Sequence, residues 1–165
     1  MMDEAHFLSP IGCIRVQGTT KGISGVTLSG QSPCPAGPIP PSLKSAIQQL
    51  NEYFLGERKA FDLTLDLQGH STFYQRVWKE LLKVPYGKTI SYQQIATQLG
   101  DPNSVRAVGQ ANGKNPIAII IPCHRCIAKN GHLQGYFYGL SVKLQLLALE
   151  NPFVFGHQGT LFKTS

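Results

Sequence analysis

Apolar and polar residues alternate differently before and after residue 70 of the chain. Residues 11–16 and 22–28 are short, β-branched runs separated by glycines, a pattern typical of strands. Apolar side chains then recur at helical spacing over residues 43–54, with Ser42 as the candidate N-cap and Gly56 as the expected end. Residues 61–67 alternate apolar and polar side chains, which predicts an amphipathic strand.

The pattern after residue 70 is mostly helical. Ser71 or Thr72 is expected to cap one helix, and Ser91 a short helix that ends at Gly100. Asp101-Pro102 begins another helix, because proline is tolerated at the first helical position, and this helix runs to about residue 113. The continuous apolar run 117–121 is buried in any conformation, and a last helix spans about residues 140–150.

These elements predict an α+β fold with two domains. Residues 1–68 form a small N-terminal αβ domain with an antiparallel sheet, and residues 71–156 form a mostly helical C-terminal domain, followed by a tail, 157–165. The two short helices around Gly100 predict a winged-helix-like helix-turn-helix. Their spacing alone favours an ordinary helical hairpin over this motif.

Composition excludes several classes of protein. With 42% hydrophobic residues the chain can bury a core, and no apolar run approaches the roughly 20 residues of a membrane helix. The acidic start lacks the pattern of a signal peptide. Four cysteines (Cys13, Cys34, Cys123 and Cys126) are too few and uneven for a disulfide scaffold, and Cys13 and Cys34 stand isolated in the sequence. We therefore expect a reducing, cytoplasmic location, or a nuclear one in a eukaryote.

Positive charge is concentrated in the second half of the chain. Residues 1–70 hold five basic and six acidic side chains, a net charge of −1, whereas residues 71–165 hold ten basic and three acidic ones, a net charge of +7. Nucleic acid is the natural partner of such a region, although a basic surface that serves only solubility explains the charge equally well. Residues 104–113 favour nucleic acid, because they place Arg106 among small residues that allow close approach to a backbone.

Cys123 is the candidate nucleophile. It follows a buried run and a rigid proline in the segment 116–126, and His124 and Arg125 beside it predict a thiol pKa that is lowered by positive charge. Cysteine is also the softest side-chain nucleophile and suits attack at carbon. The alternative is a buried structural cysteine, against which the adjacent polar pair counts.

Cys123 and Cys126 also form a Cys-X-X-Cys pair. Thioredoxin-like redox chemistry is one explanation, but Pro122 precedes the pair instead of following it. Half of a zinc site is another, but no second pair of ligands has metal spacing. We expect no metal and no other cofactor.

The chain resembles the methylated-DNA–protein-cysteine methyltransferases, also called O6-alkylguanine-DNA alkyltransferases, in their bacterial single-function form. The active-site signature is Pro122-Cys-His-Arg125. Further family-like stretches follow in the expected order over roughly residues 71–150, about half of the chain: 73–78, 85–87, 91–92, 106–109, 112–116, 135–136, 139–140, Lys143 and 146–150. The resemblance implies a protein that extrudes an alkylated guanine from DNA and moves the alkyl group irreversibly onto Cys123.

The resemblance also implies roles for individual residues. His124 would act as base through a bridging water, and Glu150 would hold its tautomer. Tyr92 would donate its hydroxyl to the departing guanine and crowd the rotating phosphate, and Asn115 would brace the turn before Cys123.

Other residues are implied in binding. Arg106 would fill the gap left by the extruded base, and Ala107, Gly109 and Ala111 would allow close approach to the minor groove, with Arg125 as a further DNA contact. Tyr136, Phe137 (through its backbone N–H), Tyr138, Cys126 and Lys143 would form or support the base pocket. The partner is then double-stranded DNA carrying alkylated bases, no membrane is involved, and the protein is expected to be a monomer.

Two positions depart from the family. Cys126 replaces the usual valine, and we predict that it forms a disulfide with Cys123 under oxidants, with reversible loss of activity. Tyr138 replaces a residue that is often small, which predicts a narrower pocket that favours methyl over benzyl groups. The main alternative function is a non-catalytic sensor of alkylated DNA, but relatives of that type lack the nucleophile. A thiol redox protein and a transcription regulator are weaker alternatives, because Arg106 among small residues is poorly suited to read major-groove base edges.

Overall fold

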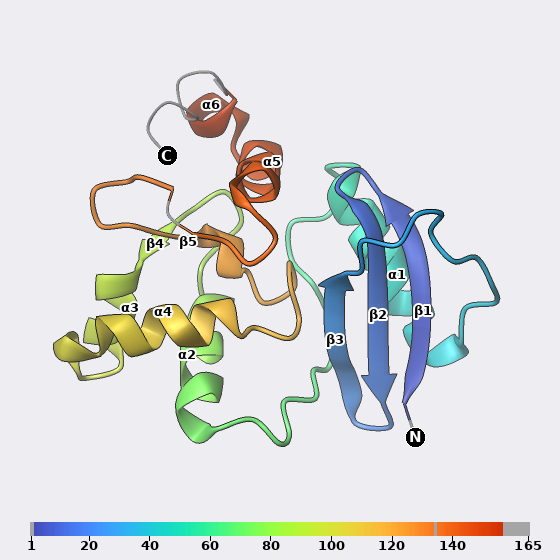
Figure 1. Cartoon of the computed structure of the whole chain (residues 1–165), viewed down its shortest axis with the longest axis horizontal. Helices are drawn as coiled ribbons and strands as arrows, with labels where there is room; N and C mark the ends of the chain where they lie inside the picture. The colour runs from blue at the N-terminus through green and yellow to red at the C-terminus, as the bar shows by residue number, and fades with distance from the viewer. Residues whose placement is uncertain (1, 134, 157–165) are drawn as a thin grey trace. The chain divides into compact units, whose positions relative to one another are not determined.

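The structure is a computed structural model that describes residues 2–133 and 135–156 (Figure 1). The predicted tail, 157–165, lies outside the described residues. The chain folds as two units, residues 2–69 with 116–120 and residues 70–115 with 121–156. The first contains an antiparallel sheet and the second is mostly helical, so the predicted α+β class is confirmed. The predicted domain limits stay a prediction, and the observed units differ from them by assigning 116–120 to the first.

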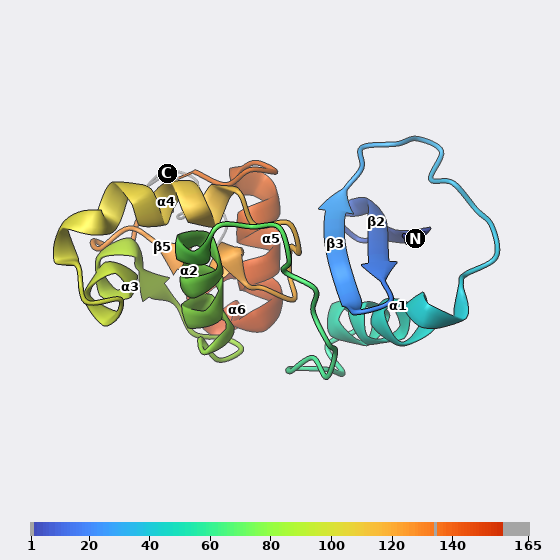
Figure 2. The same ribbon diagram turned by 90° about the horizontal axis from the view of Figure 1, so that it is seen from below.

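The first unit consists of a three-stranded antiparallel sheet and one helix. Strands β1 (Asp3–Ser9), β2 (Gly12–Thr19) and β3 (Gly22–Leu28) pair in that order, and α1 (Pro41–Phe54) covers one face (Figure 2). Side chains from both layers form the core, among them Ile14, Val16, Val26, Leu43, Ala46 and Leu50. Pro116 and Ala118 continue the sheet at the free edge of β3 through two backbone hydrogen bonds of 3.0 Å with Val26.

Two local predictions for the first unit are wrong, and one strand lies outside the predicted ranges. That strand is β1, in which apolar and polar residues do not alternate cleanly, because Asp3 and Glu4 are adjacent and Leu8 is exposed. Residues 61–67 form no strand, and only Leu65 makes a bridge, to Ile23. Ser42 lies inside α1, where its hydroxyl bonds to the Asp3 carboxylate, and the N-cap is Pro40. Pro41 sets the start of the helix because its fixed φ angle suits the first turn.

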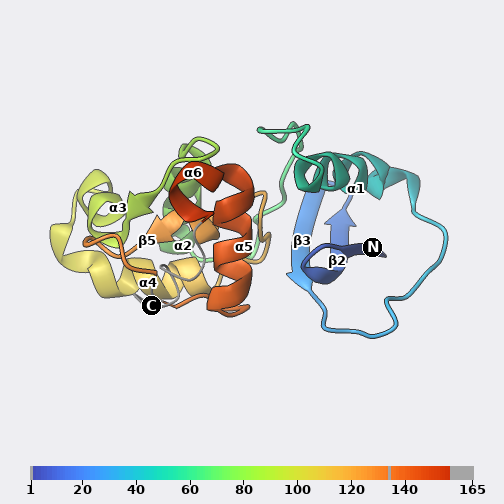
Figure 3. The same ribbon diagram turned by 90° about the horizontal axis from the view of Figure 1, so that it is seen from above.

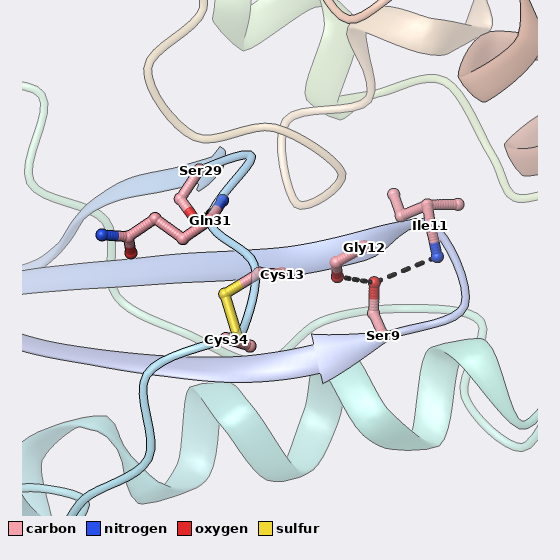
Figure 4. The surroundings of a disulfide bond; sticks show 7 residues. All are labelled: Ser9, Ile11, Gly12, Cys13, Ser29, Gln31 and Cys34. Carbon is pink, nitrogen blue, oxygen red and sulfur yellow. Dashed lines mark hydrogen bonds between the residues drawn. A yellow bond between two sulfur atoms is a disulfide. The ribbon is translucent and has the colours of Figure 1, made fainter.

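Cys13 and Cys34 form a disulfide bond, so the interpretation of both as isolated is wrong (Figure 4). Cys13 lies on β2 next to the fully buried Ile14, and its side chain faces the opposite side of the sheet from that of Ile14, because residues alternate along a strand. The connection between β3 and α1 runs along that side and returns Cys34 to within 5.3 Å, Cα to Cα, of Cys13 (Figures 2 and 3). This distance lies in the ordinary range for disulfides.

The second unit is built from short helices. They are α2 (Thr72–Leu82), α3 (Tyr92–Gln98), the 3₁₀ turn η1 (Pro102–Ser104), α4 (Val105–Gly113), the 3₁₀ turn η2 (Cys123–Arg125), α5 (Leu140–Glu150) and α6 (Pro152–Phe155). Strands β4 (Ile90–Ser91) and β5 (Cys126–Ile127) pair in parallel. In this part of the chain, the predictions that Ser71 and Ser91 are N-caps and that the last long helix spans 140–150 are confirmed.

Helices α3 and α4 form the predicted pair around Gly100, whose φ of +85° is a conformation that favours glycine. The helix predicted from Pro102 begins instead as η1 and becomes α-helical at Val105. The Trp78 indole N–H on α2 donates to the Ala111 carbonyl at 2.8 Å and fixes α4 against α2. The run 117–121 is buried, as predicted. In the described residues, no helix has the length and apolar character needed to cross a membrane.

Candidate active site

Backbone turns hold Cys123 at a fixed position. The Cys123 N–H donates to the Ile121 carbonyl at 2.8 Å across Pro122, whose φ of −81° and ψ of 65° define an inverse γ-turn. The Asn115 amide donates to the same Ile121 carbonyl at 2.7 Å, as expected of a residue that braces this turn. The Asn112 amide donates to the Cys123 carbonyl at 3.3 Å. The nucleophile therefore sits on a backbone that side chains from α4 and the following turn hold in place.

A cavity of about 230 Å³ opens beside Cys123. Its lining residues come from α3, α4, η2 and the segment before α5: Tyr92, Gly109, Asn112, Gly113, Asn115, Cys123, Gly135, Tyr136, Phe137 and Tyr138. The Cys123 Sγ lies 3.9 Å from the Tyr136 hydroxyl. The structure therefore brings five predicted site residues outside α4, namely Tyr92, Asn115, Tyr136, Phe137 and Tyr138, around the candidate nucleophile.

The thiol of Cys123 is protonated in this environment. Burial raises its pKa, and hydrogen bonds from Asn115 and Tyr136 together with the charge of Lys143 offset this only in part. The prediction that His124 and Arg125 lower this pKa is wrong, because both side chains point to Glu150 instead of the sulfur. The reaction of Cys123 therefore needs a group that removes its proton.

The Glu150 carboxylate at the end of α5 forms hydrogen bonds with the two residues that follow Cys123, namely His124 and Arg125. Its Oε2 lies 2.6 Å from His124 Nε2, and Arg125 approaches both carboxylate oxygens, with Nε to Oε1 at 2.8 Å. Arg125 also donates to the Val84 carbonyl at 2.7 Å. Burial alone would raise the pKa of Glu150, but hydrogen bonds from His124 and Arg125, together with the charges that these side chains carry at low pH, hold it at about 2. The carboxylate is therefore ionised.

The surroundings of His124 fit the predicted role of a general base. Burial lowers its pKa against the opposing effect of Glu150, so the ring is neutral at pH 7. Because the Glu150 carboxylate only accepts hydrogen bonds, Nε2 carries the ring proton and Nδ1 keeps its lone pair. Nδ1 is buried and has no hydrogen-bond partner among the described residues. The Cys-His-Glu arrangement implied by the resemblance is therefore present, with Nδ1 as the proton acceptor.

Tyr92 and the aromatic segment 136–138 form much of the cavity wall. Burial raises the pKa of Tyr92, so its hydroxyl keeps its proton and can donate a hydrogen bond. The Tyr138 ring packs edge-on against Tyr136 and Phe137, with centroids 5.8 and 5.0 Å apart. Phe137 is 77% exposed, which places its ring at the mouth of the cavity.

Cys126 and Lys143 lie behind the cavity and do not line it. The fully buried Lys143 ammonium donates to the carbonyls of Cys126, at 2.7 Å, and Gly135, at 3.3 Å, so it joins β5 to the segment that carries the aromatic wall. Burial raises the pKa of Cys126 to about 12. Both residues support the wall from within.

The residues predicted to contact DNA fall into two groups. Arg106 is exposed on α4, and Ala107 and Gly109 are partly exposed, so all three are accessible. Ala111 is fully buried against Trp78, and Arg125 is buried on Glu150, so neither is placed to touch DNA. Ala111 falls on the buried side of α4, which the apolar pattern of so short a helix did not resolve. Sequence reasoning missed Asn112, whose side chain both lines the cavity and binds the Cys123 backbone.

Metal binding finds no support in the described residues, where no three His, Cys, Asp or Glu side chains gather in a way that could hold an ion. Cys13 is engaged with Cys34.

Comparison with known proteins places this site in a family. The model of the 6-O-methylguanine DNA methyltransferase DNA-binding domain matches residues 72–152, and the model of the ribonuclease-like domain of the same proteins matches residues 4–67. Methylated-DNA–protein-cysteine methyltransferases from Mycobacterium bovis and Methanosarcina acetivorans are 48% and 44% identical to the chain. The matches cover 86% and 88% of this chain, and 88% and 96% of those proteins.

Solved structures of the same family superpose on this chain. The Mycobacterium tuberculosis O6-methylguanine methyltransferase superposes with a TM-score of 0.82 at 43% identity, over 98% of this chain and 99% of that one. The structure of the M. tuberculosis protein in complex with DNA gives a TM-score of 0.80 at 46% identity, over 89% of this chain and 92% of that one. The fold and the site thus define a protein of the DNA alkyltransferase class. The chain belongs to the 6-O-methylguanine DNA methyltransferase family.

Proposed function

We propose that this protein repairs DNA by moving the alkyl group of O6-alkylguanine onto its own Cys123, once per molecule. The observation that carries the proposal is the position of Cys123, at the wall of a cavity and next to the buried His124–Glu150 pair. Relatives that share 44–48% of their residues with the chain are named methylated-DNA–protein-cysteine methyltransferases. The non-catalytic damage sensor is not favoured, because the nucleophile and its base are both present.

The substrate base must leave the duplex, because the alkyl carbon on guanine O6 is hidden within the stack. The cavity beside Cys123 receives the extruded base between α4 and the aromatic residues 136–138. Arg106, exposed on the same helix, fills the gap in the duplex, while Ala107 and Gly109 allow α4 to approach the minor groove. The excess of positive charge after residue 70 attracts the phosphates.

Transfer moves one alkyl group and one proton. The sulfur of Cys123 forms a bond to the alkyl carbon as the bond between that carbon and guanine O6 breaks. The thiol proton leaves through a bridging water to His124 Nδ1, and Glu150 stabilises the imidazolium that forms. Tyr92 donates a hydrogen bond to the departing guanine and stabilises its negative charge. The guanine anion then takes up a proton from water, which balances the proton lost by the thiol. The thioether is too stable to revert, so each molecule acts once.

The size of the cavity determines which alkyl groups are accepted. Tyr138 lines it where a small side chain would leave more room, so methyl is the preferred group and benzyl a poor one. O4-alkylthymine, which also presents an alkylated ring oxygen, is the second substrate class to test. We further infer that double-stranded DNA is the partner and that the protein acts as a monomer in the cytoplasm (the nucleus in a eukaryote), with Cys123 as a free thiol.

A stoichiometric repair assay tests the proposal. The reduced protein is mixed with excess duplex carrying a single O6-methylguanine, and the methylated base that remains is measured. We expect one methyl group removed per protein molecule, then none, and no removal by Cys123→Ala. Repeated turnover would overturn the single-use mechanism, and an active Cys123→Ala would overturn the assignment of the nucleophile.

A further inference from the structure

Two buried acceptors flank the nucleophile. Within the described part of the second unit, Asn112 Oδ1 and His124 Nδ1 are the buried side-chain polar atoms that lack a hydrogen-bond partner. Asn112 binds the Cys123 carbonyl, and His124 follows Cys123 in the chain. Buried polar atoms without partners are rare in folded proteins because they cost free energy, and such atoms at an active site indicate a missing ligand or water. Asn112 Oδ1 and His124 Nδ1 therefore both need a hydrogen-bond donor beside Cys123.

The orientation of the Asn112 amide is fixed by its neighbour. Its Nδ2 donates to the Cys123 carbonyl at 3.3 Å, and the opposite orientation would set two acceptor oxygens against each other. Oδ1 must therefore face away from that carbonyl. The Asn112 residue is only 7% exposed and comes from α4, on the wall of the cavity that contains Cys123.

The two atoms have the same requirement. Oδ1 of an amide accepts only, and His124 Nδ1 also accepts, because the ring proton is on Nε2 toward Glu150. One molecule of water satisfies both, since it donates two hydrogen bonds and retains lone pairs of its own. Buried waters typically make about three hydrogen bonds to such groups. The third bond is then available from the protonated Cys123 thiol.

We propose that Asn112 is a positioning residue that, together with His124, holds the water through which Cys123 loses its proton. One O–H of this water points to His124 Nδ1 and the other to Asn112 Oδ1, so that a lone pair faces the Cys123 S–H. The thiol proton passes to the water oxygen as the first O–H proton passes to Nδ1, while the O–H on Asn112 is unchanged. The electron pair left on sulfur attacks the alkyl carbon. This inference rests on the proposed alkyl transfer.

The test compares Asn112→Leu and Asn112→Ala with the unchanged protein. Leucine has the branched skeleton of asparagine, with somewhat larger methyl groups that cannot hydrogen-bond, whereas alanine leaves room for a further water that restores an acceptor. Single-turnover rates on duplex with one O6-methylguanine are measured from pH 6 to 9.5, together with the dissociation constant for the same DNA and the melting temperature of each variant.

We expect Asn112→Leu to react about 10- to 100-fold more slowly at pH 7, a part of the usual contribution of general base catalysis, with DNA affinity within twofold. The defect should shrink as pH rises, because hydroxide then removes the thiol proton without the relay, and Asn112→Ala should lie between the two proteins. Equal rates at pH 7, or a defect of the same size at every pH, would overturn the inference. Should the leucine variant not fold, the pH profile of Asn112→Ala decides. Absence of transfer by the unchanged protein would instead refute the proposed function.

Discussion

The two pairs of cysteines show how differently the two units use sulfur. Cys13 and Cys34 are 21 residues apart and form a disulfide on the sheet of the first unit. Cys123 and Cys126 have the short Cys-X-X-Cys spacing often associated with disulfides, yet both are free thiols in the second unit. Spacing in the sequence therefore does not determine which cysteines pair, and the path of the backbone does.

The surroundings of each pair explain the contrast. The first pair cross-links a strand to a long loop, where a covalent bond limits the unfolded chain. In the second pair, burial raises the pKa of both thiols, so neither is ionised at rest. In the proposed mechanism the second unit keeps its nucleophile protonated until a base acts on it, and the His124–Glu150 pair is the proposed base.

Glu150→Gln should have the largest effect on this contrast, because it removes the charge that organises the second unit. Arg125 would remain buried without its anionic partner, a loss of about 3–5 kcal/mol of stability. Alkyl transfer should also fall, since His124 would lose the group that fixes its tautomer. Urea unfolding and single-turnover kinetics measure the two effects. If Glu150→Gln had the stability and the transfer rate of the unchanged protein, the Glu150 carboxylate would be shown to support neither folding nor transfer.

Cys13→Ser should destabilise the first unit by about 3 kcal/mol, the chain-entropy expectation for a loop of this length. The comparison is made by urea unfolding without reductant. Dithiothreitol should abolish the difference, because it opens the bond in the unchanged protein too. The rate of alkyl transfer should not change. A stability loss that persists under reductant would mean that serine disturbs packing, and that the cross-link itself contributes little.

Tyr138→Gly tests whether the Tyr138 ring limits the size of the alkyl group that the cavity accepts. Removing the ring should raise the rate on O6-benzylguanine relative to O6-methylguanine about 10-fold, within the 1–3 kcal/mol that pocket contacts usually discriminate. Rates on both substrates are measured in the same variant, so that a general loss of activity cancels. An unchanged ratio of the two rates would show that Tyr138 does not limit the size of the alkyl group.

Cys126→Val has the smallest expected effect on folding, below about 1.5 kcal/mol, because the side chains are similar in volume. Its effect should appear under hydrogen peroxide. A turn joins Cys123 to Cys126, whose N–H donates to the Cys123 carbonyl, so we expect the unchanged protein to form a disulfide and regain activity with dithiothreitol. The variant should lose activity without recovery. Identical loss and recovery in both proteins would contradict a Cys123–Cys126 disulfide.

Local signals predicted much of the fold. Ser71 and Ser91 mark helix starts through contacts within three residues, and the segment Leu140–Glu150 is rich in residues that favour helices. Strand β1 lay outside the predicted ranges because its own residues alternate poorly, and its pairing with β2 along the whole strand depends on residues distant from any local pattern. The Cys13–Cys34 bond depends on how a loop of 21 residues returns to the sheet, which no local rule describes.

The candidate site divides in the same way. Cys123, His124 and their neighbours could be found from a contiguous motif. The direction of the Cys123 pKa could not, because the charges of His124 and Arg125 are taken up by Glu150, 26 and 25 residues away. Asn112 begins the family-like stretch 112–116, but only its burial and its unpaired oxygen, which the structure shows, set it apart as a positioning residue.

The mass of the protein after reaction tests the central claim most directly. Reduced protein is mixed with duplex DNA carrying one O6-methylguanine, and the intact mass and the peptide masses are determined. We expect the protein to gain the mass of one methylene unit, confined to the peptide that contains Cys123 and absent in Cys123→Ala. No gain despite tight binding, or a gain located on any other residue, would contradict it.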